Sequence, residues 1–165
     1  MLVFETDVVA KGIDCFQLFD IFCTMGKRAI NEYYIYELFA GDNKIVLYSI
    51  DNTNVDLENC PCGLIYKIEK KDGELNIYIM FIATIYKYRK TGYASLFINE
   101  FIDFIKKKYL GKFENIYIIL DSIETAVTYY EYFGFKWTTT EKKYDNIFHI
   151  DETNVNEHFI MVYKL

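Results

Sequence analysis

The residues best placed to bind a charged ligand lie in one basic turn, Tyr88-Arg89-Lys90-Thr91-Gly92-Tyr93-Ala94. The β-branched and aromatic run 75–84 comes just before it and predicts a strand, and the apolar spacing over 94–109 predicts a helix. The first N–H groups of a helix have no partner inside it, and the helix dipole adds partial positive charge. Gly92 and Ala94 are small enough for a ligand to approach this backbone. The turn therefore predicts a cradle for a phosphate group.

Two better-known phosphate-binding patterns do not occur in the sequence. A Walker loop needs Gly-x-x-x-x-Gly-Lys followed by Ser or Thr, and a dinucleotide fold needs Gly-x-Gly-x-x-Gly. Gly26-Lys27 and Gly111-Lys112 are followed by Arg28 and Phe113, and the dinucleotide pattern is absent. Walker-type nucleotide hydrolysis and dinucleotide redox chemistry are therefore excluded. The string Arg89-x-x-Gly92-x-Ala94 is short, and its weight comes from its place between a strand and a helix.

A second segment downstream reinforces the turn: Ala126-Val127-Thr128-Tyr129-Tyr130-Glu131-Tyr132-Phe133-Gly134-Phe135. With both segments the chain resembles the GNAT superfamily of N-acetyltransferases. In that family an Arg or Gln, followed by x-x-Gly-x-Gly or Ala, binds the pyrophosphate of acetyl-coenzyme A, and an Ala…Tyr…Gly-Phe segment follows on the next helix. The resemblance implies a single domain over residues 1–165 with the family's α/β fold, in which helices flank a mixed central sheet.

The resemblance also assigns roles to individual residues. On the pyrophosphate of the co-substrate it places Arg89, Lys90, Thr91, Gly92, Tyr93 and Ala94. Beside the pantetheine arm it places the strand end, Ile82, Ala83 and Thr84. Tyr130 stands at the family's usual general-acid position, where a phenol of ordinary pKa about 10 would protonate the departing thiolate. Tyr129 is chemically identical, but neighbouring helical side chains point about 100° apart, so only one of the two can face the thioester.

Two positions depart from the family pattern. An Asn that often stands three residues before the alanine is Ile123 here, so its contact is either lost or supplied by Asp121 or Ser122. The proline that is common three residues before the basic residue is Tyr86, which we expect to be harmless.

The pattern does not identify a general base. Many family members carry a carboxylate on the central strand, but Asn76, Tyr78 and Met80 occupy its alternate positions here. A chain of water molecules to bulk solvent is as plausible as any side chain. The remaining candidates are Glu37 on the second helix, Glu69 on the preceding strand and His158 at the last strand.

Apolar periodicity predicts the other elements. We expect strands at 2–9, 44–50, 63–69, 115–120, 135–140 and 158–165, and helices at 14–26, 27–40 and from Asp121 or Ser122 to Gly134. Asp72-Gly73 is a hairpin signal between 63–69 and the central strand. The helix between the central strand and 115–120 predicts a right-handed parallel crossover. The polar segment 145–156 has no clear period.

Composition limits the class of protein. The chain has 165 residues, 52% of them hydrophobic, which suits one folded domain, and its net charge of −6 argues against nucleic-acid binding. No apolar run reaches the roughly 18 residues of a membrane span, and the N-terminus lacks a basic secretory start, so we expect a cytoplasmic protein that binds no membrane. The spacing of the four cysteines fits reduced thiols rather than a disulfide framework or a metal site.

These observations predict acetyl transfer from acetyl-coenzyme A to a primary amine by direct attack, without a covalent enzyme intermediate. The acceptor is a small-molecule or peptide amine, namely a polyamine, an aminoglycoside, a lysine or a peptide N-terminus, and the acidic balance favours a cationic one. The alternative is a non-catalytic acyl-coenzyme A sensor or interaction domain, which Ile123 and the missing strand carboxylate favour. A different acyl group and a homodimer also stay open at this stage.

Overall fold

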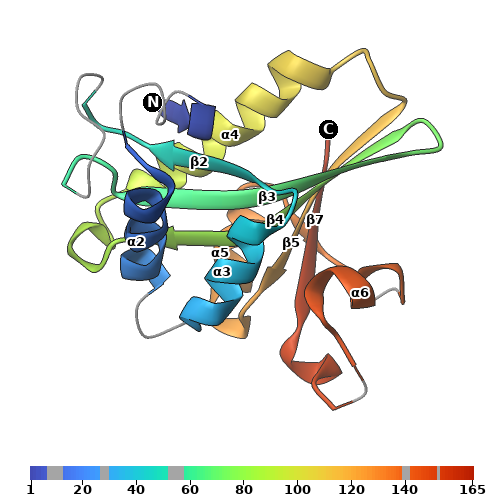
Figure 1. Ribbon diagram of the computed structural model, residues 1–165. Coiled ribbons are helices and arrows are strands. Elements are labelled where there is room, and N and C mark those ends of the chain that lie inside the picture. Colours follow the sequence, from blue (N-terminus) through green and yellow to red (C-terminus); the bar gives the residue numbers. More distant parts are fainter. Residues whose placement is uncertain (7–12, 27–29, 52–57, 139–141, 152) are drawn as a thin grey trace. The chain divides into compact units, whose positions relative to one another are not determined.

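The computed structural model describes residues 1–6, 13–26, 30–51, 58–138, 142–151 and 153–165. In this part of the chain seven strands form one mixed sheet with the hydrogen-bonded order β1-β2-β3-β4-β5-β7-β6, and helices accompany it (Figure 1). The expected α/β class is confirmed. The internal contacts divide into two units, residues 1–67 with 81–107 and residues 68–80 with 108–165, and each is described by itself.

The first unit holds the N-terminal strands and the longer helices. Its strands are β1 (Leu2–Phe4), β2 (Lys44–Tyr48), the first part of β3 (Cys62–Lys71) and the end of β4 (Glu74–Thr84). Its helices are α2 (Cys15–Gly26), α3 (Glu32–Ala40) and nearly all of α4 (Tyr93–Tyr109). β1 and β2 are antiparallel, and so are β2 and β3.

Different helices cover the two faces of the sheet in this unit. Tyr66 of β3 packs against Phe101 of α4 with ring centroids 5.1 Å apart. Phe81 of β4 packs against Phe22 of α2 at 5.5 Å. Gly63 lies three residues before Tyr66, so it faces the opposite side, where a Cβ would come within 2.9 Å of the Phe22 ring. α4 and α2 therefore lie on opposite faces of β3.

The second unit contains the crossover partner of β4 and the closing strands. Its elements are β5 (Asn115–Ser122), α5 (Val127–Tyr132), β6 (Lys136–Trp137), α6 (Asp145–Phe148) and β7 (Phe159–Lys164), with 3₁₀ turns at Glu124–Ala126, Lys142–Tyr144 and Val155–Glu157. β4 and β5 are parallel, as the crossover predicts, and β7 is antiparallel to both β5 and β6. The turn between β3 and β4 has φ of 50° at Asp72 and 83° at Gly73, the positive values that a tight two-residue hairpin needs.

Three expected boundaries are wrong. The first strand ends at Phe4 instead of residue 9, although residues 7–12 lie outside the described part of the chain. The second helix begins at Glu32, because the Asn31 side chain caps it by accepting from the Tyr33 N–H at 2.9 Å. The expected strand 135–140 is shorter, because β6 covers only Lys136–Trp137 among the described residues. Residues 27–29 and 139–141 lie outside the described part of the chain.

A fourth correction concerns the helix expected to start at Asp121 or Ser122. Both residues belong to β5, where they pair with Ile160 and Phe159 of β7. Pairing with β7 extends the strand two residues past the end that periodicity indicates. Both side chains are therefore fixed by the sheet, and not by a helix start.

The described part of the chain shows neither a membrane helix nor a metal cluster. None of the described helices combines the length and the apolar character needed to cross a membrane. All four cysteines are thiols, with Cys15 exposed and Cys60 and Cys62 buried. No group of three or more His, Cys, Asp or Glu side chains among the described residues could hold a metal ion.

Candidate functional site

The basic turn leads into α4, which begins at Tyr93. The Leu96 N–H donates to the Gly92 carbonyl at 3.1 Å, and the N–H groups of Tyr93 and Ala94 lie before this bond, in the first turn of the helix. Gly92 has φ of 91°, and a Cβ added there would meet nothing within 4 Å. Lys90 also has positive φ, 64°. An open cradle of backbone donors at a helix start fits the pyrophosphate of coenzyme A.

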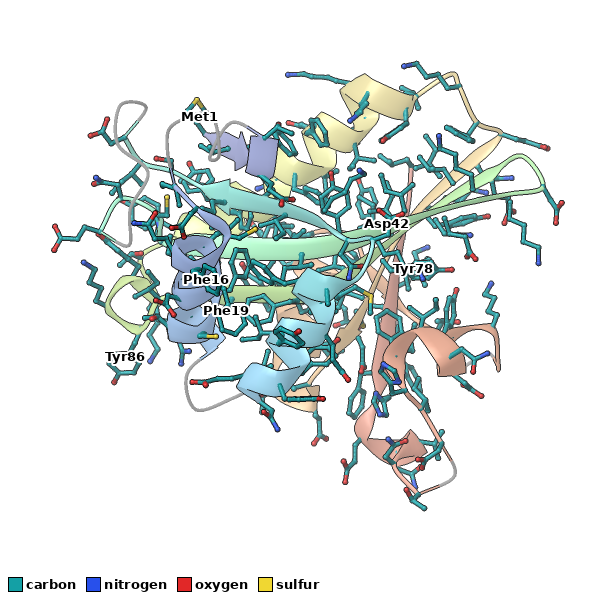
Figure 2. All side chains as sticks on the ribbon, viewed as in Figure 1. Met1, Phe16, Phe19, Asp42, Tyr78 and Tyr86 are labelled. Carbon is teal, nitrogen blue, oxygen red and sulfur yellow. The ribbon has the colours of Figure 1, made fainter. Side chains whose placement is uncertain are left out.

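Arg89 and Lys90 are exposed beside this cradle. Arg89 Nε donates to the Thr84 carbonyl at 3.3 Å, and the guanidinium lies 5.6 Å from the centroid of the Tyr86 ring. Tyr86 is itself 78% exposed (Figure 2). The side chain of Arg89 thus ties the turn to the end of β4. The strand-end residues predicted for the pantetheine arm, all of them half-buried, are Ile82, Ala83 and Thr84.

Tyr130 belongs to the second unit, in α5. Its side chain is buried, with ring centroids 5.4 Å from Tyr129 and 5.8 Å from Phe135. Among the described residues, the Tyr130 hydroxyl has no hydrogen-bond partner. Every fully buried side-chain oxygen in this part of the chain does have a partner, so the Tyr130 hydroxyl is not fully buried and a ligand can reach it. Burial, followed by the nearby Tyr129, raises the pKa of Tyr130 above that of a free phenol. Tyr130 therefore keeps its proton and can donate it to an arriving group.

Two neighbours on the same segment bear on this assignment. Tyr129 is half-buried, so Tyr130 is the more enclosed of the two adjacent tyrosines. Ile123 is 69% exposed and precedes the Glu124–Ala126 turn, where its side chain forms no cap. The amide contact that the family often makes from this position is therefore not made by Ile123.

The three candidate bases have different surroundings. Glu37 is exposed on α3 in the first unit. Glu69, in the second unit, is also exposed and accepts a hydrogen bond from the Tyr78 hydroxyl at 3.0 Å. Burial, followed by this hydrogen bond, raises the pKa of Tyr78. His158 is half-buried, and its Nδ1 lies 2.5 Å from Asp121 Oδ2. Of the three, only His158 has a carboxylate oriented against it.

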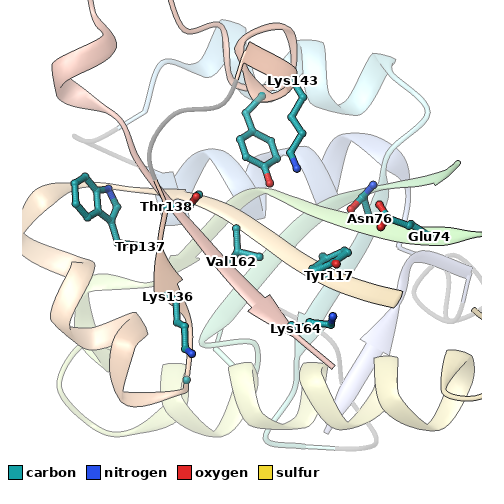
Figure 3. Close-up of a pocket in the computed structure, with 11 residues that line it drawn as sticks. Glu74, Asn76, Tyr117, Lys136, Trp137, Thr138, Lys143, Val162 and Lys164 are labelled. Atoms are coloured by element: carbon teal, nitrogen blue, oxygen red, sulfur yellow. The ribbon is translucent and has the colours of Figure 1, made fainter. Parts of the chain in front are cut away.

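A pocket of about 590 Å³ lies within the second unit (Figure 3). Its lining comes from β4, β5, β6, β7 and the turn at Lys142–Tyr144, segments too far apart in sequence for any motif to join them. Lys164 Nζ lies 5.6 Å from the centroid of the Tyr117 ring in this pocket. The charged lining residues are Glu74, Lys136, Lys143 and Lys164.

Comparison with known families decides the class of the chain. A model of the Acetyltransferase (GNAT) domain matches residues 25–152, which is most of the sequence. The chain belongs to the GNAT acetyltransferase family. A curated relative of this GNAT chain is the N-alpha-acetyltransferase 50 of Danio rerio, 29% identical over 79 residues. That match covers 47% of this chain and 46% of the relative, so the chain matches about half the relative's length.

Solved structures of GNAT proteins are similar over nearly the whole chain. One is Arabidopsis thaliana Naa50 in complex with the bisubstrate analogue CoA-Ac-MVNAL, with a TM-score of 0.60, 20% identity and 99% of each chain covered. Another is a GNAT family acetyltransferase from Elizabethkingia anophelis with acetyl-CoA bound, with a TM-score of 0.62 and 16% identity, covering 100% of this chain and 97% of the other. These likenesses confirm the GNAT fold.

Proposed function

We propose that the protein transfers the acetyl group of acetyl-coenzyme A to the α-amine of a peptide. The observation that carries the proposal is the open turn at Gly92, at the start of α4 in a chain of the GNAT family. The relative from Danio rerio is an N-alpha-acetyltransferase, and the Arabidopsis neighbour holds an analogue that joins coenzyme A to a peptide. Both support a peptide amine over the other acceptors.

The charge of the pocket also supports this choice. Three lysines and one glutamate line it, so a polyamine or an aminoglycoside would meet net positive charge there. The chain as a whole has a net charge of −6, which would attract a polycation from a distance. Charges farther away than about 8 Å are largely screened at physiological salt, so the pocket lysines dominate once an acceptor is bound. A peptide of neutral or acidic character fits better.

The chemistry we propose is direct attack of the amine on the thioester. A new C–N bond forms as the attacking amine gives up one proton to a base or to solvent. The C–S bond breaks and the departing sulfur takes a proton from Tyr130, while strand-end backbone N–H groups support the oxyanion. Burial raises the pKa of the Cys62 thiol to about 11, so almost none of it is thiolate at neutral pH. Cys62 is therefore a poor nucleophile, which is consistent with transfer that does not pass through a cysteine.

Two measurements test the proposal. Acetyl-coenzyme A should raise the unfolding temperature, because a ligand that binds only the folded state stabilises it. The peptide Met-Val-Asn-Ala-Leu with a free N-terminus should then release coenzyme A, measured by chromatography so that the exposed Cys15 does not contribute to the signal. Stabilisation without acetylation of any amine would instead support the acyl-coenzyme A sensor, and no stabilisation would overturn both.

Tyr130→Phe tests the acid. The variant should retain acetyl-coenzyme A affinity and lose about a hundredfold or more in kcat, the usual contribution of a positioned acid. Tyr132→Phe is the matched control, because Tyr132 lies on the same helix and is 84% exposed. Equal kcat values for the two variants would show that Tyr130 is only a packed aromatic side chain.

A further inference from the structure

We propose that His158 is the general base of this acetyl transfer and that Asp121 is the residue that positions it. The inference rests on the proposed function and adds the base, which the sequence left undecided between three side chains and water. All of its parts lie within the second unit.

The two residues form a close pair held on both sides. His158 Nδ1 lies 2.5 Å from Asp121 Oδ2, and Asp121 Oδ1 accepts from the Phe159 N–H at 3.0 Å. The side chains retain 16% and 22% exposure, so they are neither enclosed in the core nor loose on the surface. Because both carboxylate oxygens are engaged, the orientation of the imidazole ring is fixed.

This contact determines which ring nitrogen can act. An ionised carboxylate can only accept hydrogen bonds, so in the neutral ring the proton sits on Nδ1 and the lone pair is left on Nε2. The described residues offer Nε2 no hydrogen-bond partner. A neutral imidazole nitrogen held in this way can accept a proton from an amine.

The pair lies where β5 still pairs with β7 and no longer pairs with β4. The pairing of β4 with β5 ends at Ile79 and Leu120, and Asp121 is the next residue of β5. Asp121 pairs with Ile160 of β7, which fixes its carboxylate at a position where β5 no longer pairs with β4. His158 is extended, with φ of −104° and ψ of 127°, and lies two residues before Ile160. Its side chain is therefore on the same face of the sheet as that of Asp121.

The proposed acid approaches from the other face. Tyr163 alternates with Ile160 along β7 and so faces the opposite side, where its ring lies 5.4 Å from Phe135, the neighbour of Tyr130. The base and the acid therefore lie toward opposite faces of the sheet. The attacking amine loses one proton to His158 Nε2, and the departing sulfur gains one from Tyr130. Solvent then removes the proton from His158 and returns one to Tyr130, so protons balance over the cycle.

The first test compares three variants of the full chain with acetyl-coenzyme A and the Met-Val-Asn-Ala-Leu peptide. His158→Gln should keep acetyl-coenzyme A affinity and peptide KM while kcat falls about a hundredfold or more. Added imidazole should restore part of the kcat of His158→Ala. His149→Asn is the matched control, because His149 is the other histidine of the chain and has φ of 55°, a backbone conformation that Asn tolerates. Its kcat should be that of the wild type.

Asp121→Asn tests the positioning role. Asn can keep the acceptor for the Phe159 N–H while it turns an N–H donor toward His158, which reverses the tautomer and blocks Nε2. Long-range ¹H–¹⁵N spectra should show the proton on Nδ1 in the wild type and on Nε2 in the variant, with His149 unchanged. The variant should therefore lose kcat together with the Nδ1 proton, whereas a pair that only stabilises the fold would switch tautomer with kcat unchanged.

The outcomes separate the two proposals. Wild-type turnover that survives His158→Gln overturns the inference, leaves the acetyl transfer intact and makes water the base. If His158→Gln loses kcat but imidazole does not rescue His158→Ala, the base assignment is also overturned. An Nε2–H tautomer in the wild type overturns it as well. No turnover by the wild type overturns the proposed function itself, and the base assignment falls with it.

Discussion

Gly92 and Gly111 have the same backbone requirement in different places. Their φ values are 91° and 79°, and an added Cβ would meet nothing within 4 Å at either position. Any other L-residue is strained in this conformation although space is available. Gly92 lies at the predicted pyrophosphate cradle, whereas Gly111 lies in the connection between α4 and β5. A substitution at Gly111 therefore measures the energetic cost of the strained turn alone, whereas the same substitution at Gly92 also tests ligand binding.

Replacing each glycine with alanine makes use of this match. Gly92→Ala and Gly111→Ala should each lower the free energy of unfolding by about 1–2 kcal/mol, the cost of a side chain in the left-handed region. Only Gly92→Ala should also weaken acetyl-coenzyme A binding, because the strain moves the backbone donors away from the ligand. Urea unfolding measures the first effect and calorimetric titration the second. Equal affinity of the two variants would show that the turn at Gly92 does not hold the co-substrate.

At the scale of elements, the packing of α2 on β3 depends on one missing side chain. A Cβ at Gly63 would lie 2.7 Å from Met25 Sδ and 2.9 Å from the Phe22 ring, and both of those side chains are buried in the core. Met25 can move its flexible end, but the Phe22 ring is also in contact with Phe81. The helix can therefore approach the strand this closely only over glycine.

Gly63→Ala should push α2 away from β3 and cost about 1–3 kcal/mol of stability, the usual penalty for overpacking a core. Adding Phe22→Leu, which removes the ring that the new methyl group meets, should recover part of the loss. A double-mutant cycle in urea measures this coupling. Additive losses would mean that the methyl group is accommodated without contact with Phe22.

At the scale of the whole molecule, net charge and local charge point to different acceptors. The net charge of −6 favours cations, and the three pocket lysines favour anions. Asp121 and Tyr117, a pocket residue, lie on the same face of β5 four residues apart, a separation of about 13 Å. An extended peptide acetylated beside Asp121 would thus bring about its fourth residue to the pocket.

A peptide Met-Val-Asn-Asp-Asp-Leu should therefore be acetylated with a higher kcat/KM than Met-Val-Asn-Lys-Lys-Leu. The double variant Lys136→Glu, Lys164→Glu should reverse this order and leave acetyl-coenzyme A affinity unchanged. The single tryptophan, Trp137, lines the same pocket and is 57% exposed, so its fluorescence should report binding of the acidic peptide. If the wild type and the double variant prefer the same peptide, the acceptor does not bind in this pocket.

Features that depend on neighbours along the chain can be predicted from the amino-acid sequence. The order of elements, the hairpin at Asp72-Gly73, the parallel crossover and the GNAT family all follow from local periodicity, turn chemistry and two short motifs. Boundaries were less accurate where a capping side chain or a partner strand shifts an end. Asn31 moves one helix start, and pairing with β7 carries β5 through Ser122.

Contacts between polar groups far apart in the sequence depend on the folded structure. Asp121 and His158 are 37 residues apart, and only the antiparallel register of β5 and β7 brings them together. The pocket lysines likewise come from three separate segments. Burial is similarly a property of the folded chain, which is why two adjacent tyrosines that look equivalent in sequence become one enclosed residue, Tyr130, and one half-buried neighbour. Local patterns fix which elements form, whereas contacts between elements fix which side chains can do chemistry.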